Sequence, residues 1–284
     1  MKVCLDCLRN FSNIVFECPF CGFAPKIKKG FLSFAPDLDG RDNYFYSDQL
    51  ADYFRFENNH FWFRMRSELL LWSIHKYFPK INKFFEVGCG TGFIIHGLAN
   101  SIPVLKIVGA DVHCLALEYC SSRLLDVDLF QMDAINIPFY EEFDVIGAFD
   151  VIEYIEEDER VLQEMNKAVI PGGGIILTVP QHKWLWSGTD VHTGHKRRYS
   201  RKELIRKIVN AGFELERITS FMSFLFPLFV LSRLCNRTGY EFRISKIVNV
   251  MCMSVCQLER KFIHLGLNFP LGGSLLCVAK KPLK

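Results

Sequence analysis

The stretch FFEVGCGTGF, residues 84–93, places three glycines within five positions, directly after an apolar run and an acid. Glycine lets a turn tighten and lets a ligand approach the main chain closely. The stretch lies between an expected buried strand at 83–88 and a helix expected to start at Phe93, whose first N–H groups lack helical partners. A loop of this kind is typical of nucleotide-binding α/β proteins.

The spacing of the glycines and the preceding acid narrow the class of ligand. A dinucleotide-binding loop has the pattern G-x-G-x-x-G, and Phe93 stands where that pattern needs its third glycine. The glycines here are Gly88, Gly90 and Gly92. The carboxylate of Glu86 would repel a pyrophosphate, whereas it suits a cationic amino group. The stretch therefore favours a nucleoside that carries an amino acid.

Two more acids end the next two expected strands. Asp111 ends a strand at 106–112, and Asp133 ends a strand at 128–134. Ligands of parallel sheets bind outside the carboxyl ends of the strands. A carboxylate at position 111 can accept both hydroxyls of a ribose, and one at position 133 can accept from an adenine amino group. Either acid alone could equally be a solvated loop residue or a helix cap.

The rest of the chain predicts an α/β fold with a parallel sheet covered on both faces. Further strands are expected at 143–152, 175–180, 213–221 and 274–282, and helices at 114–124, 156–169 and 201–211. Residues 47–78 are predicted to be helical, and residues 222–272 to form an insertion of two apolar helices before the last strand.

The N-terminal segment carries two C-x-x-C pairs, Cys4 with Cys7 and Cys18 with Cys21. Two such pairs at this separation predict a tetrahedral zinc site. Because all four ligands are cysteines, the metal is expected to be structural; four unligated thiols are the alternative. The expected domains are a zinc ribbon at 1–35, a linker and N-terminal helices at 36–80, and the main domain at 81–284.

Taken together, these segments resemble the class I S-adenosylmethionine-dependent methyltransferases. EVGCGTG resembles their first motif, and GADV, QMDAINIPF, FDVIGAFDVIEYIEE and IPGGGIILTVP resemble the later motifs in order and spacing. The resemblance implies a Rossmann-like seven-stranded sheet whose last strand is antiparallel, and S-adenosylmethionine as cofactor. The cofactor-binding residues it implies are Glu86, Gly88, Cys89, Gly90, Gly92, Asp111, Val112, Asp133, Ala134 and Asp150. The family often has a histidine where this chain has Tyr154.

The methyl acceptor is expected to bind after the fifth strand, where three histidines cluster. Methyl transfer from a sulfonium needs alignment, and a base if the acceptor is a hydroxyl. We take His195 and then His192 as the candidate bases; bracing of the loop is the alternative role. Candidate acceptor-binding residues are Tyr154, Trp186, Arg197, Arg198 and Tyr199. The Arg pair would suit an anionic acceptor, unless the basic run at 196–207 is a solvated helix face.

This part of the chain also resembles small-molecule methyltransferases of glycan, lipid and natural-product pathways, so a small or lipid-like acceptor is expected. The apolar segment 221–235 predicts either buried packing or contact with a membrane surface. No apolar run is long enough to span a membrane. An N-terminus without an apolar leader and an odd number of cysteines, 11 in all, predict a cytoplasmic protein, with peripheral membrane contact as a further option.

Two other classes of function stay open. A cysteine ribbon before such a core also resembles a group of ribosomal-RNA methyltransferases, which would make the ribbon an RNA-binding unit. The net charge of +3 is small for that role, and the basic residues form no obvious stripe. A non-catalytic binding module is the third option. The sequence leaves the oligomeric state open.

Overall fold

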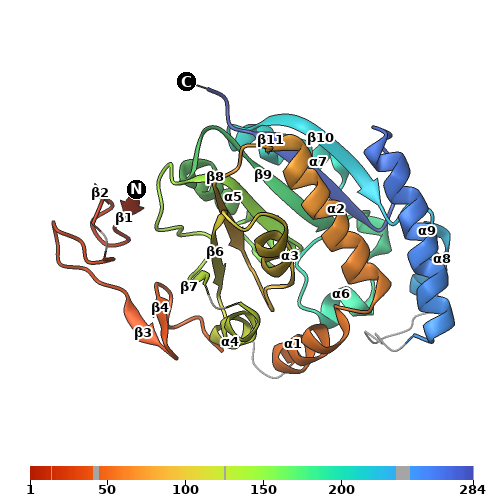
Figure 1. Ribbon diagram of the computed structural model, residues 1–284, viewed down its shortest axis with the longest axis horizontal. Helices are drawn as coiled ribbons and strands as arrows, with labels where there is room; N and C mark the ends of the chain where they lie inside the picture. The colour runs from red at the N-terminus through yellow and green to blue at the C-terminus, as the bar shows by residue number, and fades with distance from the viewer. Residues whose placement is uncertain (14, 41–44, 125, 235–243, 284) are drawn as a thin grey trace.

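The structure is a computed structural model that describes residues 1–13, 15–40, 45–124, 126–234 and 244–283. A twisted central sheet forms the middle layer, and helices cover both of its faces (Figure 1). A small unit at the N-terminus lies at one end of the molecule. Helices α8 (Phe226–Leu234) and α9 (Lys246–His264) lie at the other end (Figure 1).

The central sheet has nine strands in the described part of the chain. In spatial order they are β10 (Glu214–Phe221), β11 (Ser274–Lys280), β9 (Val169–Pro180), β8 (Phe143–Phe149), β5 (Lys83–Val87), β6 (Lys106–Asp111), β7 (Asp128–Gln131), β4 (Phe31–Ser33) and β3 (Lys26–Lys28). The seven strands from β10 to β7 are those that the sequence predicts. β11 is antiparallel to both of its neighbours, which confirms the expected last strand.

The predicted number of strands is wrong, because residues assigned to the zinc ribbon extend the sheet. β4 pairs in parallel with β7, through Leu32 with Phe130 and Ser33 with Gln131, and β3 pairs antiparallel with β4. Each of these strands has three residues, which is too short to show a period of two. The hairpin covers the exposed backbone of β7, which would otherwise be an open edge.

The central strands are buried on both sides, as a parallel sheet requires. Phe84 and Phe85 are adjacent and both fully buried, yet they belong to different core clusters, because successive side chains of a strand point to opposite faces. The Phe84 side of the sheet packs against α2 (Phe61–Tyr77), α3 (Phe93–Ser101), α4 (Cys114–Arg123) and α9. The Phe85 side packs against α5 (Asp158–Ala168) and α7 (Arg201–Asn210).

The stretch predicted as helical at 47–78 is two helices, α1 (Phe45–Phe56) and α2. His60 caps the start of α2, where its Nδ1 accepts a hydrogen bond from the Trp62 amide at 3.2 Å. Burial lowers the pKa of His60 to about 4, so the ring is a neutral acceptor near pH 7. Residues 41–44 of the predicted linker lie outside the described residues.

The predicted insertion at 222–272 contains two helices, α8 and α9, as expected. The part of the insertion at 235–243 lies outside the described residues. Across the described ranges, no helix combines the length and the apolar character that crossing a bilayer requires.

Candidate cofactor and acceptor site

A cavity of 1980 Å³ lies at the carboxyl ends of β5, β6 and β8. Pockets for one small ligand typically occupy about 300–1,000 Å³, so this cavity has room for two ligands. The predicted site residues that line it are Glu86, Gly88, Cys89, Gly90, Asp111, Val112, Asp133, Ala134, Asp150, Tyr154, His192, His195 and Arg198. Gly92, Trp186, Arg197 and Tyr199 do not line it.

The three positions of the loop require glycine for different reasons. Their φ angles are +68° at Gly88, +53° at Gly90 and +74° at Gly92, a region that disfavours a Cβ. A Cβ on Gly88 would lie 2.4 Å from Val151, and one on Gly92 would lie 2.5 Å from Cys120. A Cβ on Gly90 would meet no described heavy atom within 4 Å. Packing therefore requires the outer two glycines, whereas the open space at Gly90 belongs to the cavity.

Glu86 is a buried carboxylate that lacks a hydrogen-bond donor on one oxygen. Its side chain is 3% exposed, and its Oε2 accepts no hydrogen bond from the described residues. Burial raises the pKa of Glu86 well above its usual range, and nearby Cys120 and Asp111 act in the same direction against Arg66. An unpaired buried carboxylate is costly. A cationic group bound in the cavity would supply the missing donor.

Asp111, at the end of β6, is held by two backbone amides. Its Oδ2 accepts from the amide of Gly90, and its Oδ1 accepts from the amide of His113, both at 3.0 Å. Each carboxylate oxygen has two acceptor positions. The side chain is therefore fixed and can still accept from a pair of hydroxyls, as a ribose presents.

Asp133 follows β7 and forms a local turn. Its Oδ1 accepts from the amide of Ile135 at 3.1 Å, an arrangement that Asp commonly adopts in turns. The turn fixes the carboxylate on the same cavity wall as Ala134 and Val112. With Glu86 and Asp111, Asp133 completes the set of strand-end acids that the sequence predicts.

Asp150 follows β8 and adopts a φ of +59°. Its carboxylate forms an ion pair with Arg66 of α2. The guanidinium carbon of Arg66 also lies 4.6 Å from the centroid of the Trp62 ring. A non-glycine residue in this conformation costs on the order of 1–3 kcal/mol, and such strain is common at functional sites. Arg66 could not be predicted as a site residue from the sequence, because nothing in the helical pattern separates it from its neighbour Arg64.

Glu153 is a second buried acid on the cavity, also missed from the sequence. It is fully buried, and neither carboxylate oxygen accepts a hydrogen bond from another described residue. Burial raises the pKa of Glu153 well above its usual range; Asp150 adds to this, while Arg66 and Arg198 oppose it. Glu153 is one of several acids in VIEYIEE, and the pattern resembles the solvated start of a helix, so nothing in the sequence marks it as buried.

His195 lies between an acid and a phenol. Its Nδ1 is 3.1 Å from Oδ1 of Asp190, and its Nε2 is 3.0 Å from the hydroxyl of Tyr154. Burial alone would raise the pKa of Asp190, but hydrogen bonds from His195 and Arg198 and the charge of Arg233 hold it below its usual range. The ionised Asp190 favours a proton on Nδ1 of His195, which leaves Nε2 to accept from Tyr154. His192, the second candidate base, ends α6 (Gly188–His192) and also lines the cavity.

Tyr199 and Arg197 do not contact the cavity, contrary to prediction. Tyr199 is fully buried, and its hydroxyl donates to Asp158 Oδ2 at 2.7 Å. Arg197 forms ion pairs with Glu156 at 2.8 Å and with Asp158 at 3.1 Å. Trp186 is 42% exposed and also lies outside the cavity. The acids around the start of α5 thus hold both residues against the body of the protein.

Arg198 lines the cavity, but its charge is already paired. Its Nε and Nη2 donate to Asp190 at 2.8 and 2.7 Å, and its Nη1 donates to the carbonyl of Gln181 at 3.1 Å. Arg198 therefore orients Asp190, and through it His195, rather than offering a free guanidinium to an anionic acceptor.

Glu57 braces the glycine loop from the break between α1 and α2. Its buried carboxylate accepts from Oγ1 of Thr91 at 2.8 and 3.0 Å and forms an ion pair with Arg123. This contact was not predicted, because the sequence indicates a continuous helix at 47–78, whereas Glu57 directly follows the end of α1.

The four N-terminal cysteines meet at one point. Their Sγ atoms lie within 4.8 Å of one another, with Cys4 to Cys21 at 3.5 Å and Cys7 to Cys18 at 3.6 Å. Zinc–sulfur bonds of about 2.3 Å in a tetrahedron place the sulfurs roughly 3.8 Å apart. The cluster therefore fits a tetrahedral zinc ion and suggests such a site.

Parts of the chain are similar to known methyltransferases. Residues 85–177 match the family model of a methyltransferase domain. The chain is 24% identical over 159 residues to a probable S-adenosylmethionine-dependent methyltransferase of Mycolicibacterium smegmatis, a match that covers 55% of this chain and 60% of that protein. It is 30% identical over 96 residues to the demethylmenaquinone methyltransferase of Thermotoga maritima, covering 34% and 42%. The chain thus spans less than two thirds of the length of these relatives.

A solved S-adenosylmethionine-dependent methyltransferase of Thermotoga maritima shares the fold. The TM-score is 0.55 at 18% identity, covering 84% of this chain and 98% of that one. The sheet order and the antiparallel last strand therefore define a class I α/β methyltransferase fold. The domain match and the curated relatives support an enzyme of the S-adenosylmethionine-dependent class.

Proposed function

We propose that this chain transfers the methyl group of S-adenosylmethionine to a small-molecule acceptor bound in the same cavity. The observation that carries the proposal is the unpaired buried oxygen of Glu86, in the same cavity as the open backbone at Gly90. A cationic amino group would satisfy this carboxylate, and the fixed carboxylate of Asp111 suits a ribose. The relatives, which include a demethylmenaquinone methyltransferase, favour a small acceptor.

In this proposal each part of the cofactor has its own contacts. Glu86 and the backbone of Gly88, Cys89 and Gly90 hold the methionine end; Asp111 and Val112 hold the ribose; Asp133 and Ala134 hold the adenine; Asp150 is the remaining predicted contact. Gly92 acts indirectly, because its bare backbone lets α3 start against Cys120.

Bound S-adenosylmethionine would supply a methyl group carried on a sulfonium. When the methyl group passes to the acceptor, the cofactor leaves as a neutral thioether. The residues of the chain supply alignment and a path for the proton of a hydroxyl or amine acceptor. Tyr154 faces the cavity and donates to Nε2 of His195, so a proton lost from the acceptor can pass through Tyr154 to His195. The imidazolium formed would be stabilised by the ionised Asp190. His195 is thus the first candidate base in this proposal, and His192 is the second.

The far wall of the cavity favours a lipid-like acceptor. It contains Leu225, Leu228 and Phe229 near and within α8, and Val248 and Cys252 of α9. Leu228 is 62% exposed and Val248 is 46% exposed although both line the cavity. The apolar wall therefore continues onto the outer surface, where an apolar chain could leave the cavity. In this proposal the protein is cytoplasmic and touches a membrane through residues 221–235, of which Cys235 lies outside the described residues.

The same proposal gives the four-cysteine cluster a structural zinc ion. The ligands are Cys4, Cys7, Cys18 and Cys21, and four thiolates leave no open position for catalysis. We expect metal analysis of the purified protein to find one zinc per chain; a metal-free protein that folds normally would contradict this part of the proposal.

Calorimetry with S-adenosylmethionine and S-adenosylhomocysteine on the zinc-containing chain tests the cofactor assignment. We expect both to bind at one site, with no competition from a nicotinamide dinucleotide. Mass spectrometry of ligands that co-purify in the cavity would then identify the acceptor. Absence of binding would contradict the proposal. Retention on RNA that falls steeply with salt concentration would instead favour an RNA substrate.

A further inference from the structure

We infer that the cysteine cluster controls the affinity of the cofactor cavity, and that Gln131 is the positioning residue that connects them. The inference rests on the cofactor assignment proposed above and adds a coupling between two separate sites. It follows from a chain of contacts that runs from the N-terminal unit through the β3–β4 hairpin to the residues beside Asp111.

Gln131 joins the hairpin to the ribose side of the cavity. It is fully buried at the end of β7, where its Oε1 accepts from Ser33 Oγ at 2.5 Å and from the Ala35 amide at 3.3 Å. Its Nε2 donates to the carbonyls of Ala35 and Val112, both at 2.8 Å. Both amide hydrogens and both acceptor positions of the side chain are therefore used. One set of these bonds holds the N-terminal segment, and the other fixes the residue that follows Asp111.

Asp39 forms a second connection between the same segments. Its Oδ1 accepts from the amide of Cys114, the first residue of α4, at 2.9 Å. Its Oδ2 lies 3.0 Å from Nζ of Lys28 on β3. The neighbouring Leu38 lines the cavity itself. The chain that leaves the hairpin therefore packs directly against the loop between β6 and α4, which carries the ribose contact.

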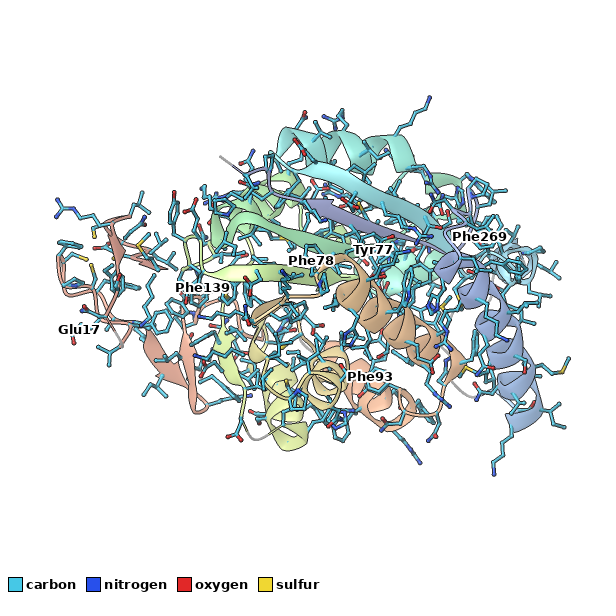
Figure 2. The ribbon with its side chains drawn as sticks, turned by 45° about the horizontal axis from the view of Figure 1, so that its top comes forward. Glu17, Tyr77, Phe78, Phe93, Phe139 and Phe269 are labelled. Carbon is cyan, nitrogen blue, oxygen red and sulfur yellow. The ribbon has the colours of Figure 1, made fainter. Side chains whose placement is uncertain are left out.

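Phe16 connects the cysteine cluster to the hairpin. It lies between the two cysteine pairs in the sequence, and its ring packs edge to face against Phe34 at 5.2 Å, Phe130 at 5.2 Å and Phe139 at 5.8 Å. Figure 2 shows Phe139 on the side of the sheet that faces the N-terminal unit. Phe34 directly precedes Ala35, and Phe130 directly precedes Gln131. A displacement of Phe16 would therefore reach both residues that flank the amide network.

The N-terminal unit, which carries Phe16, has only a small core of its own. β1 (Lys2–Val3) and β2 (Asn10–Phe11) form its sheet, and its buried apolar residues are Cys4, Phe11 and Cys18. Small units of this kind usually fold only when the metal is bound. Loss of zinc would release Phe16, loosen the hairpin and free the Val112 carbonyl. Cofactor affinity would then fall, and because linkage is reciprocal, bound cofactor would strengthen zinc binding.

Two binding measurements test this coupling. The first is calorimetry with S-adenosylhomocysteine on the full chain, before and after chelation of zinc under reducing conditions; we expect affinity about tenfold lower without zinc, within the usual range of coupling. The second is zinc affinity by equilibrium competition with a chromophoric chelator; saturating S-adenosylhomocysteine should raise it by the same factor. Equal affinities in either measurement would overturn the inference. If the zinc-loaded chain bound no S-adenosylhomocysteine at all, the proposed cofactor itself would be wrong.

The variant Gln131→Met separates positioning from simple support of the fold. It keeps the length of the side chain and removes all four hydrogen bonds. We expect it to retain zinc, to bind S-adenosylhomocysteine about as weakly as the zinc-free wild type, and to lose little further affinity on chelation, because coupled residues are not additive. An unchanged effect of chelation in this variant would overturn the role of Gln131.

Asp39→Asn provides a milder variant in case Gln131→Met does not unfold cooperatively. Asn keeps an acceptor for the Cys114 amide but loses the ion pair with Lys28. We expect normal zinc content with a two- to fivefold loss of affinity for S-adenosylhomocysteine, about a third to two thirds of the tenfold effect on a logarithmic scale. Glu118→Gln is the matched control, because it removes only the exposed ion pair of Glu118 with Lys29; a larger loss there than in Asp39→Asn would contradict the proposed path.

Discussion

The two walls of the cavity are built in different ways. The cofactor wall comes from the ends of β5, β6 and β7, and each of its acids lies within two residues of a strand end. The acceptor wall combines Tyr154, the loop after α6, and helices α8 and α9, which meet only through tertiary packing. The sheet thus fixes the wall that holds a constant cofactor, whereas long-range contacts shape the wall that must suit one acceptor.

Among the described residues, each wall also carries a buried acid that lacks a hydrogen-bond donor. Glu86 lies on the cofactor side and Glu153 follows β8 on the acceptor side. Burial raises the pKa of both well above the usual range. A folded protein keeps such groups at a cost in stability, and the cost is consistent with ligands that supply the missing partner on each side.

Replacing Asp111 with alanine should have the largest effect and should act on the cofactor wall alone. The change removes two hydrogen bonds from the ribose to a charged group, each worth about 1.5–3 kcal/mol. We therefore expect calorimetry to show at least a 100-fold loss of affinity for S-adenosylhomocysteine while the fold stays intact. Asp128→Ala is the control, since Asp128 is exposed at the start of β7; unchanged affinity in Asp111→Ala would refute the ribose assignment.

The glycine loop allows a sharper comparison within the cofactor wall. Gly92→Ala forces a Cβ to within 2.5 Å of Cys120 at a positive φ, so we expect about 2–3 kcal/mol of lost stability in chemical denaturation. Gly90→Ala meets only the strain of its φ, about 1 kcal/mol, but its methyl group enters the cavity. We expect it to lose cofactor affinity out of proportion to stability. If Gly90→Ala instead lost more stability than cofactor affinity, packing would be the reason for glycine at all three positions of the loop.

Most of the cofactor wall could be predicted from the sequence, because its signals are local. Glu86, the glycines, Asp111 and Asp133 each follow an apolar strand within a residue or two, so strand recognition alone brings them to one edge. Arg66 and Glu57 could not be predicted in the same way. They come from helices whose contact with the loop depends on how α2 packs on the sheet.

On the acceptor wall, the sequence identified the right segment but not the direction of each side chain. Arg197, Arg198 and Tyr199 are consecutive, yet only Arg198 reaches the cavity. Tyr199 turns inward to Asp158, a residue 41 positions earlier. The hairpin β3–β4 was missed for a related reason: its strands are too short for periodicity, and their place is set by pairing with β7.

Glu153→Gln should raise stability, and the gain should depend on pH. The pKa of Glu153 is higher in the folded protein than the ordinary value of 4.5, so the folded state binds the proton more tightly. The acid therefore lowers stability only above about pH 4.5, and increasingly so as pH rises towards the folded pKa. We expect the Tm difference between variant and wild type to grow from pH 5 to pH 8, by about 2–4 °C for each kcal/mol recovered.

The exposed Glu156 offers a matched control for this measurement. Glu156→Gln removes an acid three residues away whose side chain is 67% exposed and paired with Arg197. Such surface pairs contribute about 0–1 kcal/mol, so its Tm difference should be small and flat across the same pH range. A flat profile for Glu153→Gln as well would show that Glu153 already has a partner that keeps it ionised.

Tyr154→Phe should have the smallest effect on cofactor affinity. A small effect would show that Tyr154 belongs to the acceptor wall and not to the cofactor wall. The change removes the hydroxyl that meets Nε2 of His195 at 3.0 Å and leaves every proposed cofactor contact in place. We expect affinity for S-adenosylhomocysteine within about twofold of wild type, because a factor of two is only about 0.4 kcal/mol, while transfer to the acceptor falls once that acceptor is identified. Loss of cofactor affinity comparable to that of Asp111→Ala would show that Tyr154 belongs to the cofactor wall, and that the proton path through His195 is misassigned.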